Sequence, residues 1–320
     1  MAVYTEITER ELEALVGEYQ IGAVRACKGI AEGVENSNFL LTTDRGNYFL
    51  TLYEKRVDPA DLPFFLGLLD HLAARGIPCP TPIHGKDGNA VRRCACRPAA
   101  IVTFLQGISH RRISAADCAE LGAALAALHQ AGLDFPLARA NTLSVDGWRP
   151  IFAAARPRAH EVMPELEKQL AAELDDLERN WPRALPMGVI HADLFPDNVL
   201  FLDGRVSGLI DFYFACNDAL AYDIAICLNA WCFEADRSFN VTKARALLSG
   251  YGAGRALNAA ELAALPILAR GAALRFLLTR LYDWLNTPPG ALVKPKDPLE
   301  YWHKLRFHRG VTSSAAYGLE

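Results

Sequence analysis

The pattern of apolar residues changes at about residue 104, and this change constrains the fold more strongly than any other feature of the sequence. Before it, short runs of β-branched and aromatic residues, separated by turn residues, predict strands. These runs are Ile21–Lys28, Asn38–Thr42, Tyr48–Tyr53, Asn89–Arg93 and Ala99–Phe104. After Gly107 the apolar residues recur at helical spacing, with one β-type interruption at about Met187–Ile210. We therefore expect an α+β chain of two lobes, the first rich in strands and the second mainly helical, with a cleft between them.

Helix signals and helix breakers place the lobe boundaries. One helix is expected among the strands of the first lobe, over Ala60–Arg75, because Gly76 and a proline-rich stretch end it there. The N-terminal lobe is placed at residues 1–104 and the helical lobe at residues 105–310. Residues 311–320 are expected to form a flexible tail. Further helices are predicted at Thr8–Gly17, Ser114–Gly132, Glu165–Trp181 and, as several segments, across Ala219–Phe307.

The composition limits the classes of function. Of the 320 residues, 51% are hydrophobic and 22% are charged, so the chain can bury a large core without disulfides or metals. The net charge of −4 gives no reason to expect nucleic acid or an anionic membrane as a partner. The N-terminus lacks the apolar segment of a signal peptide, and no apolar run approaches the ~18 residues of a membrane span. The eight cysteines form no CxxC pair. We expect a cytoplasmic monomer or homodimer with free thiols.

The strongest chemical signal is the segment His191–Asn198, which lies between two β-type runs. Asp193 offers a carboxylate that can accept a proton from an attacking hydroxyl, and Asn198 offers an amide oxygen that can ligate a hard cation. Asp211 adds a second carboxylate at the end of a short apolar strand. Either aspartate alone could be a turn residue. Together with the phosphates of a nucleotide, however, this set is adequate for Mg²⁺ and for phosphoryl transfer, which requires mainly positioning and charge neutralisation.

A second signal is the glycine-containing stretch Gly29–Phe39, which joins two predicted strands. Gly29 and Gly33 allow the backbone to approach phosphates. Ser37 and Asn38 can donate hydrogen bonds to them. The stretch is not a Walker loop, because no Gly-Lys-Ser/Thr follows. A plain β-turn is the alternative interpretation, and the position of the stretch ahead of the two carboxylates favours a nucleotide site.

The pattern HxDxxxxN, followed by Ile-Asp-Phe at a strand end, resembles the aminoglycoside phosphotransferase and choline kinase superfamily, which shares the protein-kinase-like fold. The resemblance implies an N-terminal antiparallel β-sheet lobe with one internal helix and a larger, mainly helical C-terminal lobe. It also implies ATP and Mg²⁺ as cofactors. Asp193 would be the catalytic base, and His191 would orient the loop. Asn198 and Asp211 would be the Mg²⁺ ligands.

The resemblance also places an adenine-binding hinge at Ile101–Gly107, with the Thr103 carbonyl and the Leu105 amide as the pairing groups. An ordinary strand end is the alternative. One position departs from the kinase pattern, because Thr51 stands on the third predicted strand where a phosphate-binding lysine is expected. Basic residues that could supply the charge instead are Lys28, Lys55 and Arg56.

Three further stretches look like the homoserine kinases within this superfamily, and the similarity extends over nearly the whole chain. They are Gly29–Asn38, Leu50–Arg56 and Asp211–Asp218. The resemblance implies transfer of the ATP γ-phosphate to L-homoserine, which gives O-phospho-L-homoserine for threonine biosynthesis. Such an acceptor needs a cation for its carboxylate. Candidates are Arg275 and Arg280, with Tyr213 as a wall of the pocket, and a structural or solvated role is open for each.

Two other functions remain open at this point. The chain could be another small-molecule kinase of the superfamily, acting on an amino alcohol, a sugar or an aminoglycoside. It could also be a nucleotide-binding pseudokinase, for which the absence of the third-strand lysine is the only support. The intact set of Asp193, Asn198 and Asp211 argues against a pseudokinase.

Overall fold

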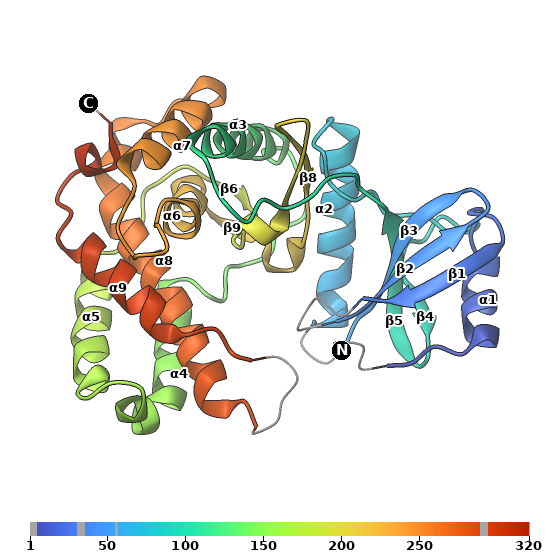
Figure 1. The fold of residues 1–320 in the computed structure, drawn as a ribbon, viewed down its shortest axis with the longest axis horizontal. Helices are drawn as coiled ribbons and strands as arrows, with labels where there is room; N and C mark the ends of the chain where they lie inside the picture. Colours follow the sequence, from blue (N-terminus) through green and yellow to red (C-terminus); the bar gives the residue numbers. More distant parts are fainter. Residues whose placement is uncertain (1–4, 31–35, 55–56, 289–293, 320) are drawn as a thin grey trace. The chain divides into compact units, whose positions relative to one another are not determined.

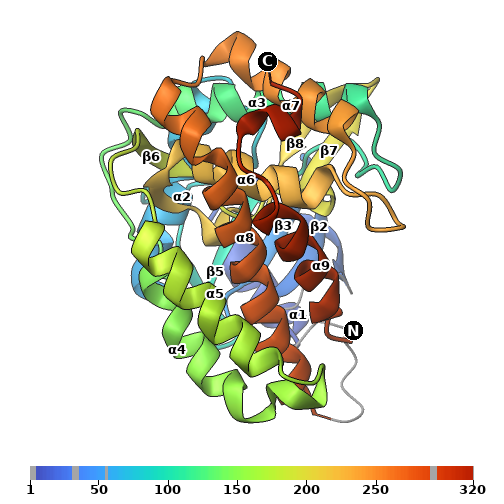
Figure 2. The same ribbon diagram turned by 90° about the vertical axis from the view of Figure 1, so that its left-hand side faces the viewer.

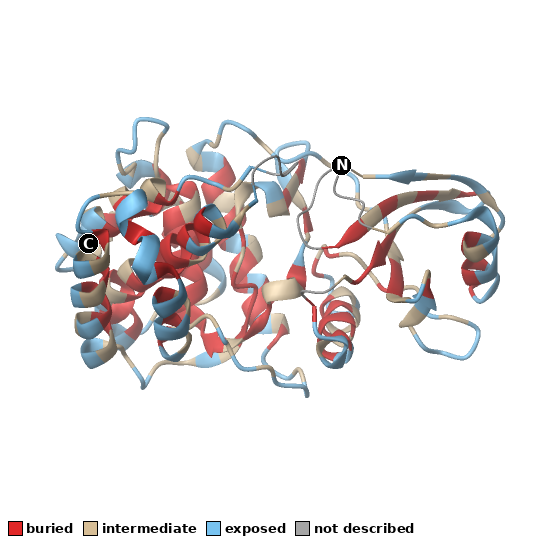
Figure 3. Ribbon diagram, turned by 90° about the horizontal axis from the view of Figure 1, so that it is seen from below, coloured by how far each residue is buried: buried red, intermediate tan, exposed pale blue. Residues whose placement is uncertain are grey.

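The structure is a computed structural model that describes residues 5–30, 36–54, 57–288 and 294–319 (Figure 1). The chain divides into two compact units. The first comprises the chain up to Gly107 together with Ser207–Tyr213, and the second comprises Ile108–Val206 and the chain from Phe214 onward. Each unit has its own buried core, which Figure 3 shows by colouring the residues by burial.

The segment Ser207–Tyr213 joins the first unit, although the sequence places it in the second lobe. Ser207 Oγ donates a hydrogen bond to the Gln106 carbonyl at 2.7 Å. The Leu209 N–H donates to the Pro78 carbonyl, also at 2.7 Å. These are tertiary contacts between residues more than a hundred positions apart, so the local sequence pattern does not predict them.

Five antiparallel strands form the sheet of the first unit, in the order β1-β2-β3-β5-β4. They are β1 (Val24–Gly29), β2 (Ser37–Thr43), β3 (Gly46–Leu52), β4 (Arg92–Cys94) and β5 (Arg97–Thr103). Buried and half-buried residues alternate along β2, which is the period of a strand with one face on the core. The predicted antiparallel sheet is confirmed.

Two helices accompany this sheet. Helix α1 (Glu9–Gly17) begins at a capping box, in which Thr8 and Glu11 each accept the backbone N–H of the other. Its buried apolar residues pack against one face of the sheet. Helix α2 (Leu62–Ala74), which follows a 3-10 turn at Pro59–Asp61, is the internal helix expected from the sequence.

The described part of the second unit consists mainly of α-helices (Figures 1 and 2). They are α3 (Ala115–Ala131), α4 (Val145–Ala155), α5 (Leu166–Asn180), α6 (Leu220–Trp231), α7 (Val241–Gly254), α8 (Ala259–Asn286) and α9 (Pro298–Arg309). The strands are β6 (Met187–Ile190), which pairs with β9 (Cys216–Ala219), and β7 (Val199–Leu202). Strand β7 pairs with β8 (Arg205–Leu209), whose residues from Ser207 onward are counted with the first unit. Together with the sheet of the first unit, this arrangement confirms the α+β fold class.

Helix α4 and strand β9 are not predicted from the sequence. Helix α4 contains Gly147 and Pro150, two residues that normally mark turns. It forms because Trp148 is fully buried and donates its indole N–H to the Leu143 carbonyl at 2.8 Å. The gain from burying a tryptophan side chain outweighs the weak helix propensity of the segment.

Helix α8 lies at the centre of the second unit, next to α4, α6 and α9 (Figure 2). It is the one helix among the described residues that is long and apolar enough to cross a membrane, with a mean hydropathy of 1.5 over its most apolar window. Because 72% of that window is buried inside the unit, the apolar surface of α8 serves the protein core.

Helices α3 and α7 approach each other closely through glycines. A Cβ atom at Gly122 on α3 would overlap the Leu247 carbonyl oxygen, and a Cβ atom at Gly250 on α7 would overlap the Ala119 carbonyl oxygen. Each helix therefore offers a surface without side chains to the backbone of the other. This close contact fixes the position of α3, which carries His129, a residue of the candidate site described below.

The flexible tail predicted at residues 311–320 is packed, over residues 311–319, against the rest of the second unit. It contains a 3-10 turn at Ser314–Tyr317, and Tyr317 is fully buried. The Tyr317 hydroxyl lies 2.8 Å from His308 Nδ1 on α9, and Arg245 Nε on α7 donates to the Gly318 carbonyl at 3.2 Å. One buried aromatic side chain therefore anchors this segment.

The close contact between α3 and α7 gives a testable prediction. Gly250→Ala should lower the free energy of unfolding by about 1–3 kcal/mol, because the added methyl group overlaps backbone that cannot move aside. Gly252→Ala, two residues further along the same helix with no heavy atom within 4 Å of its Cβ position, is the matched control. It should leave stability unchanged or raise it by up to about 1 kcal/mol. Urea denaturation measures both, and equal shifts would contradict the proposed close packing.

Candidate active site

The turn that carries Asp193 closes on itself. Strand β6 leads into it, and a 3-10 turn at Pro196–Asn198 leads out into β7. The half-buried Asp193 accepts at its backbone carbonyl from the Phe195 N–H and from Asn198 Nδ2, each at 2.8 Å. Asn198 Nδ2 also lies 3.3 Å from Asp193 Oδ2. Because the amide nitrogen of Asn198 is used on Asp193, its amide oxygen is left without a donor among the described residues, as a ligand for a hard cation requires.

His191 lies behind this turn and is fully buried. Its Nδ1 accepts the Asp193 N–H at 3.3 Å, a contact that fits the predicted role of His191 in orienting the loop. Between the two, Ala192 has a φ of 63°, in the left-handed region that side-chain-bearing residues rarely adopt. Such a conformation persists only where neighbouring groups hold it.

Asp223 on α6 binds the backbone of the loop that carries Asp193. One carboxylate oxygen accepts the His191 N–H at 2.7 Å, and the other accepts the Ala192 N–H at 2.9 Å. His129 Nε2 on α3 lies 3.2 Å from the same carboxylate, and His129 Nδ1 lies 2.8 Å from the Tyr251 hydroxyl on α7. Burial raises the pKa of Asp223, but the hydrogen bond and charge of His129 outweigh this and hold the pKa below its ordinary value. The carboxylate is therefore ionised and fixes two backbone amides of the loop.

Arg275 on α8 holds the other side of the same loop. Its Nη1 donates to the Ala192 carbonyl, and the side chain is enclosed, with 2% of the residue exposed. The guanidinium lies 4.4 Å from the ring centre of Phe276 and 5.7 Å from that of Phe214. The peptide group that joins Ala192 to Asp193 is thus held at both ends, at its carbonyl by Arg275 and at its N–H by His191.

This geometry corrects the sequence-based expectation for Arg275. It is predicted as a ligand for the carboxylate of an amino-acid acceptor, but its enclosed guanidinium is bonded to the backbone of the loop. We therefore assign Arg275 to positioning of the loop. The sequence offered no signal for this, because the two residues that meet are 83 positions apart.

Two predicted site residues lie in the segment that belongs to the first unit. Asp211 is exposed at the end of β8 and has a φ of 65°. Tyr213 packs edge-on against Tyr53 at 5.6 Å and against Phe65 at 5.8 Å between ring centres. Burial raises the pKa of Tyr213, so its phenol stays neutral. The roles of Asp211 as a metal ligand and of Tyr213 as a pocket wall remain predictions.

The predicted phosphate-binding stretch is only partly described, and Gly33 lies outside the described residues, as do Lys55 and Arg56. Gly29 ends β1, as expected. Ser37 is fully buried and its hydroxyl donates a hydrogen bond to Glu54 at 2.8 Å. Because this hydroxyl is bonded within the protein, we remove Ser37 from the candidate phosphate ligands.

The position of the expected third-strand lysine is also described. Asn38 accepts the Thr51 hydroxyl at 2.9 Å across the β2–β3 pair. A neutral hydrogen bond therefore occupies the place of the expected lysine.

The predicted hinge follows β5. Thr103 exchanges two hydrogen bonds with the Thr81 backbone, through its N–H and its hydroxyl, each at 2.9 Å. Phe104 stacks on Phe49 with ring centres 5.5 Å apart. The half-buried Leu105 donates its N–H to no described residue, which leaves this amide available to a planar ligand edge.

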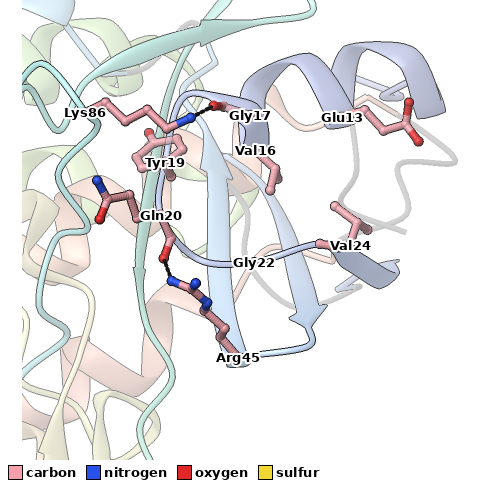
Figure 4. Close-up of a pocket in the computed structure, with 10 residues that line it drawn as sticks. Glu13, Val16, Gly17, Tyr19, Gln20, Gly22, Val24, Arg45 and Lys86 are labelled. Atoms are coloured by element: carbon pink, nitrogen blue, oxygen red, sulfur yellow. Dashed lines mark hydrogen bonds between the residues drawn. The ribbon is translucent and has the colours of Figure 1, made fainter.

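Neither a cluster of metal-binding side chains nor a hollow on the first unit offers a second chemical site in the part of the chain that the structure describes. No three His, Cys, Asp or Glu side chains of that part of the chain converge to hold a metal ion. A hollow of about 550 Å³ on the first unit, shown in Figure 4, contains none of the predicted site residues. There Lys86 donates to the Gly17 carbonyl at 2.7 Å, and Arg45 donates to the Gln20 carbonyl at 2.8 Å. These cations satisfy carbonyl groups at and just beyond the end of α1.

Comparison with known proteins identifies the family of this chain. A sequence model of the phosphotransferase enzyme family matches residues 26–257. The homoserine kinases of Paramagnetospirillum magneticum and Rhodospirillum rubrum are each 65% identical to this chain. The first alignment covers 100% of both proteins, and the second covers 100% of this chain and 99% of the relative.

Solved structures with low sequence identity share the fold. An amicoumacin kinase in complex with AMP-PNP, Ca²⁺ and Ami has a TM-score of 0.69 at 16% identity, over 94% of this chain and 92% of that one. The spectinomycin phosphotransferase APH(9)-Ia, in complex with ADP and spectinomycin, has a TM-score of 0.69 at 13% identity, over 98% of both chains. The predicted protein-kinase-like fold is confirmed.

The position of Arg275 gives a second prediction. Arg275→Met should lower the turnover number for phosphoryl transfer by about 10- to 100-fold, because the peptide before Asp193 loses one of its two anchors. The KM for ATP should change little, and Arg275→Lys, which can still donate to the carbonyl, should recover part of the turnover. Steady-state kinetics together with the thermal midpoint of each variant measure this. A Met variant that is folded and fully active would contradict the assignment.

Proposed function

The chain belongs to the phosphotransferase enzyme family, and from this premise we propose that it is a homoserine kinase, an enzyme that transfers the γ-phosphate of ATP to the side-chain hydroxyl of L-homoserine. The observation that carries this conclusion is the 65% identity to several curated homoserine kinases over the full length of the chain. The product is O-phospho-L-homoserine, which places the enzyme in threonine biosynthesis.

Asp193 aligns the acceptor and takes its proton. The half-buried carboxylate is fixed by the closed turn, so it meets the acceptor hydroxyl without having to reorganise. The hydroxyl oxygen forms a bond to the γ-phosphorus, the bond from that phosphorus to the β,γ-bridging oxygen breaks, and the hydroxyl proton passes to Asp193. The loop anchors described above keep the carboxylate in place through this step.

Asn198 and Asp211 would hold Mg²⁺, which neutralises the charge that develops on the phosphates when it is bound. The free amide oxygen of Asn198 supports this assignment. The Leu105 amide and the Thr103 carbonyl would pair with adenine, and Gly29 at the end of β1 would allow the backbone to approach the phosphates. With Thr51 and Asn38 bonded to each other, β3 brings no charge to the phosphates.

The enzyme acts on small molecules, and we expect it to work in the cytoplasm without nucleic-acid or membrane partners. The net charge of −4 and the buried apolar surface of α8 support this expectation.

A substrate panel tests the proposed function. The purified protein is incubated with Mg²⁺·ATP and L-homoserine, and in parallel with choline, L-serine and an aminoglycoside, while ADP release is measured. We expect ADP release above background with L-homoserine alone. Release with another alcohol would retain the mechanism and reject the substrate, whereas ATP binding without release from any acceptor would favour a pseudokinase.

A substitution tests the role of Asp193. Asp193→Asn should reduce turnover by about 10²- to 10⁴-fold, because an amide cannot accept the hydroxyl proton. Nucleotide affinity should be retained, since the substitution keeps the shape of the side chain. Steady-state kinetics with L-homoserine and equilibrium binding of a non-hydrolysable ATP analogue measure the two quantities, and wild-type turnover would exclude Asp193 as the base.

A further inference from the structure

A cluster of three charged side chains lies where α8 meets α9. Arg280 on α8 donates through Nη1 to Glu300 Oε2 at 2.6 Å, and Lys304 on α9 donates to Glu300 Oε1 at 2.7 Å. The side chains of Arg280 and Lys304 are only 10% and 8% exposed, whereas that of Glu300 is 41% exposed. One carboxylate thus serves two almost enclosed cations, and the cluster carries a surplus positive charge.

The surplus positive charge of this cluster destabilises the protein when no ligand is bound. Burial lowers the pKa of Lys304, and the positive charges of Arg280 and Lys296 oppose its protonation further. Burial of a cation without a full counter-charge costs several kcal/mol. The Tyr301 ring offsets part of this cost, because Arg280 Cζ lies 4.4 Å and Lys304 Nζ lies 4.3 Å from its centre.

The guanidinium of Arg280 has donors to spare. Its Nη1 contacts Glu300 and, at 3.4 Å, the Asp297 carbonyl. Its Nε and Nη2 donate to no described residue, and neither is among the fully buried polar atoms that lack a partner. They therefore retain access to solvent. Two adjacent N–H groups on one edge of a guanidinium match the two oxygens of a carboxylate.

The same cluster adjoins the catalytic loop. The Tyr301 ring packs against Phe276 at 5.3 Å and against Phe195, the second residue after Asp193, at 6.5 Å between centres. The Tyr301 hydroxyl is fully buried and has no hydrogen-bond partner in the described part of the chain. Burial raises the pKa of Tyr301 well above its ordinary value, and the Asp193 carboxylate contributes to the rise, so the phenol lies within electrostatic range of Asp193.

Two ring distances limit the separation between Arg280 and the Phe195 side chain of the catalytic loop. Arg280 Cζ is 4.4 Å from the centre of the Tyr301 ring, which is 6.5 Å from that of Phe195. An extended homoserine with one hydrogen bond at each end reaches about 11 Å. The Arg280 guanidinium and the ring of Phe195, the second residue after Asp193, are therefore within one acceptor length of each other.

From these contacts we propose that Arg280 and Lys304 bind the α-carboxylate of the acceptor, with Glu300 holding the two cations in place. This inference rests on the proposed function and extends it by naming the site that selects an amino acid over a simple amino alcohol. The carboxylate supplies the missing negative charge, and the hydroxyl at the other end of the acceptor is directed toward Asp193.

The experiment compares two acceptors on each enzyme preparation. L-Homoserine carries the carboxylate, and 3-amino-1-propanol is the same molecule without it. For wild type, kcat/KM should be higher for L-homoserine. Arg280→Met and Lys304→Met should each lower this preference by about 10- to 100-fold, the effect of losing a charge-assisted hydrogen bond. Because both acceptors are assayed on the same preparation, a partly unfolded variant does not alter the ratio.

Two further variants sharpen the comparison. Arg280→Lys keeps the charge and should retain part of the preference. Arg270→Met removes a cation from the same helix, one that is paired with Glu173 and Asp176, and it should leave the preference unchanged. An unchanged ratio in both Arg280→Met and Lys304→Met, an equal loss of activity with both acceptors, or an equal effect of Arg270→Met would each overturn the inference.

The experiment distinguishes a failure of the proposed function from a failure of the carboxylate site. If the wild-type enzyme releases no ADP with L-homoserine, the premise fails and the inference is overturned with it. If the wild type is active with L-homoserine and the ratio does not move in the variants, only the carboxylate site is wrong.

Discussion

The buried carboxylate of Asp223 is the contact on which the arrangement of the helical unit depends. It receives the backbone N–H groups of His191 and Ala192 and the ring of His129 without any exposed surface. A carboxylate left unpaired in such a place would cost several kcal/mol, so α3 must stay fixed against α6. Tyr251 on α7 holds the other nitrogen of the His129 ring, and the glycine contacts between α3 and α7 hold these two helices together. The geometry of the loop therefore depends on the packing of α3, α6 and α7.

Three arginines of α8 lie in different charge environments. Arg270 faces two carboxylates, those of Glu173 and Asp176, and its charge is balanced. Arg275 makes no ion pair among the described residues and is held by a carbonyl and two aromatic rings, while Arg280 shares one carboxylate with a lysine. The charge of Arg270 is balanced, and this residue links helices. The positive charges of Arg275 and Arg280 are not fully balanced, and both residues lie near the loop that carries Asp193, where a bound anion or the negative charge of a transition state can compensate them.

The third strand supplies no charge at the position where the kinase pattern predicts a lysine. Thr51 and Asn38 form a neutral cross-strand hydrogen bond, and the described strand β3 carries no cation at all. The helical unit instead places Arg275 behind the loop and Lys296 5.5 Å from the ring centre of Phe195 within it.

The amino-acid sequence by itself determined the five strands and the internal helix of the first unit, the capped starts of α1 and α3, and the turn that carries Asp193 and Asn198, because periodicity, caps and turns act over ten residues or fewer. Only the tertiary structure decided that Ser207–Tyr213 belongs to the first unit, that Arg275 positions the loop rather than binding an acceptor, and that the C-terminal tail is anchored. It also formed α4 against the local signals of Gly147 and Pro150. The physical reason is common to these cases. Whether a polar or aromatic side chain is buried, and which group it meets there, depends on segments that are distant in sequence and adjacent only after the chain has folded.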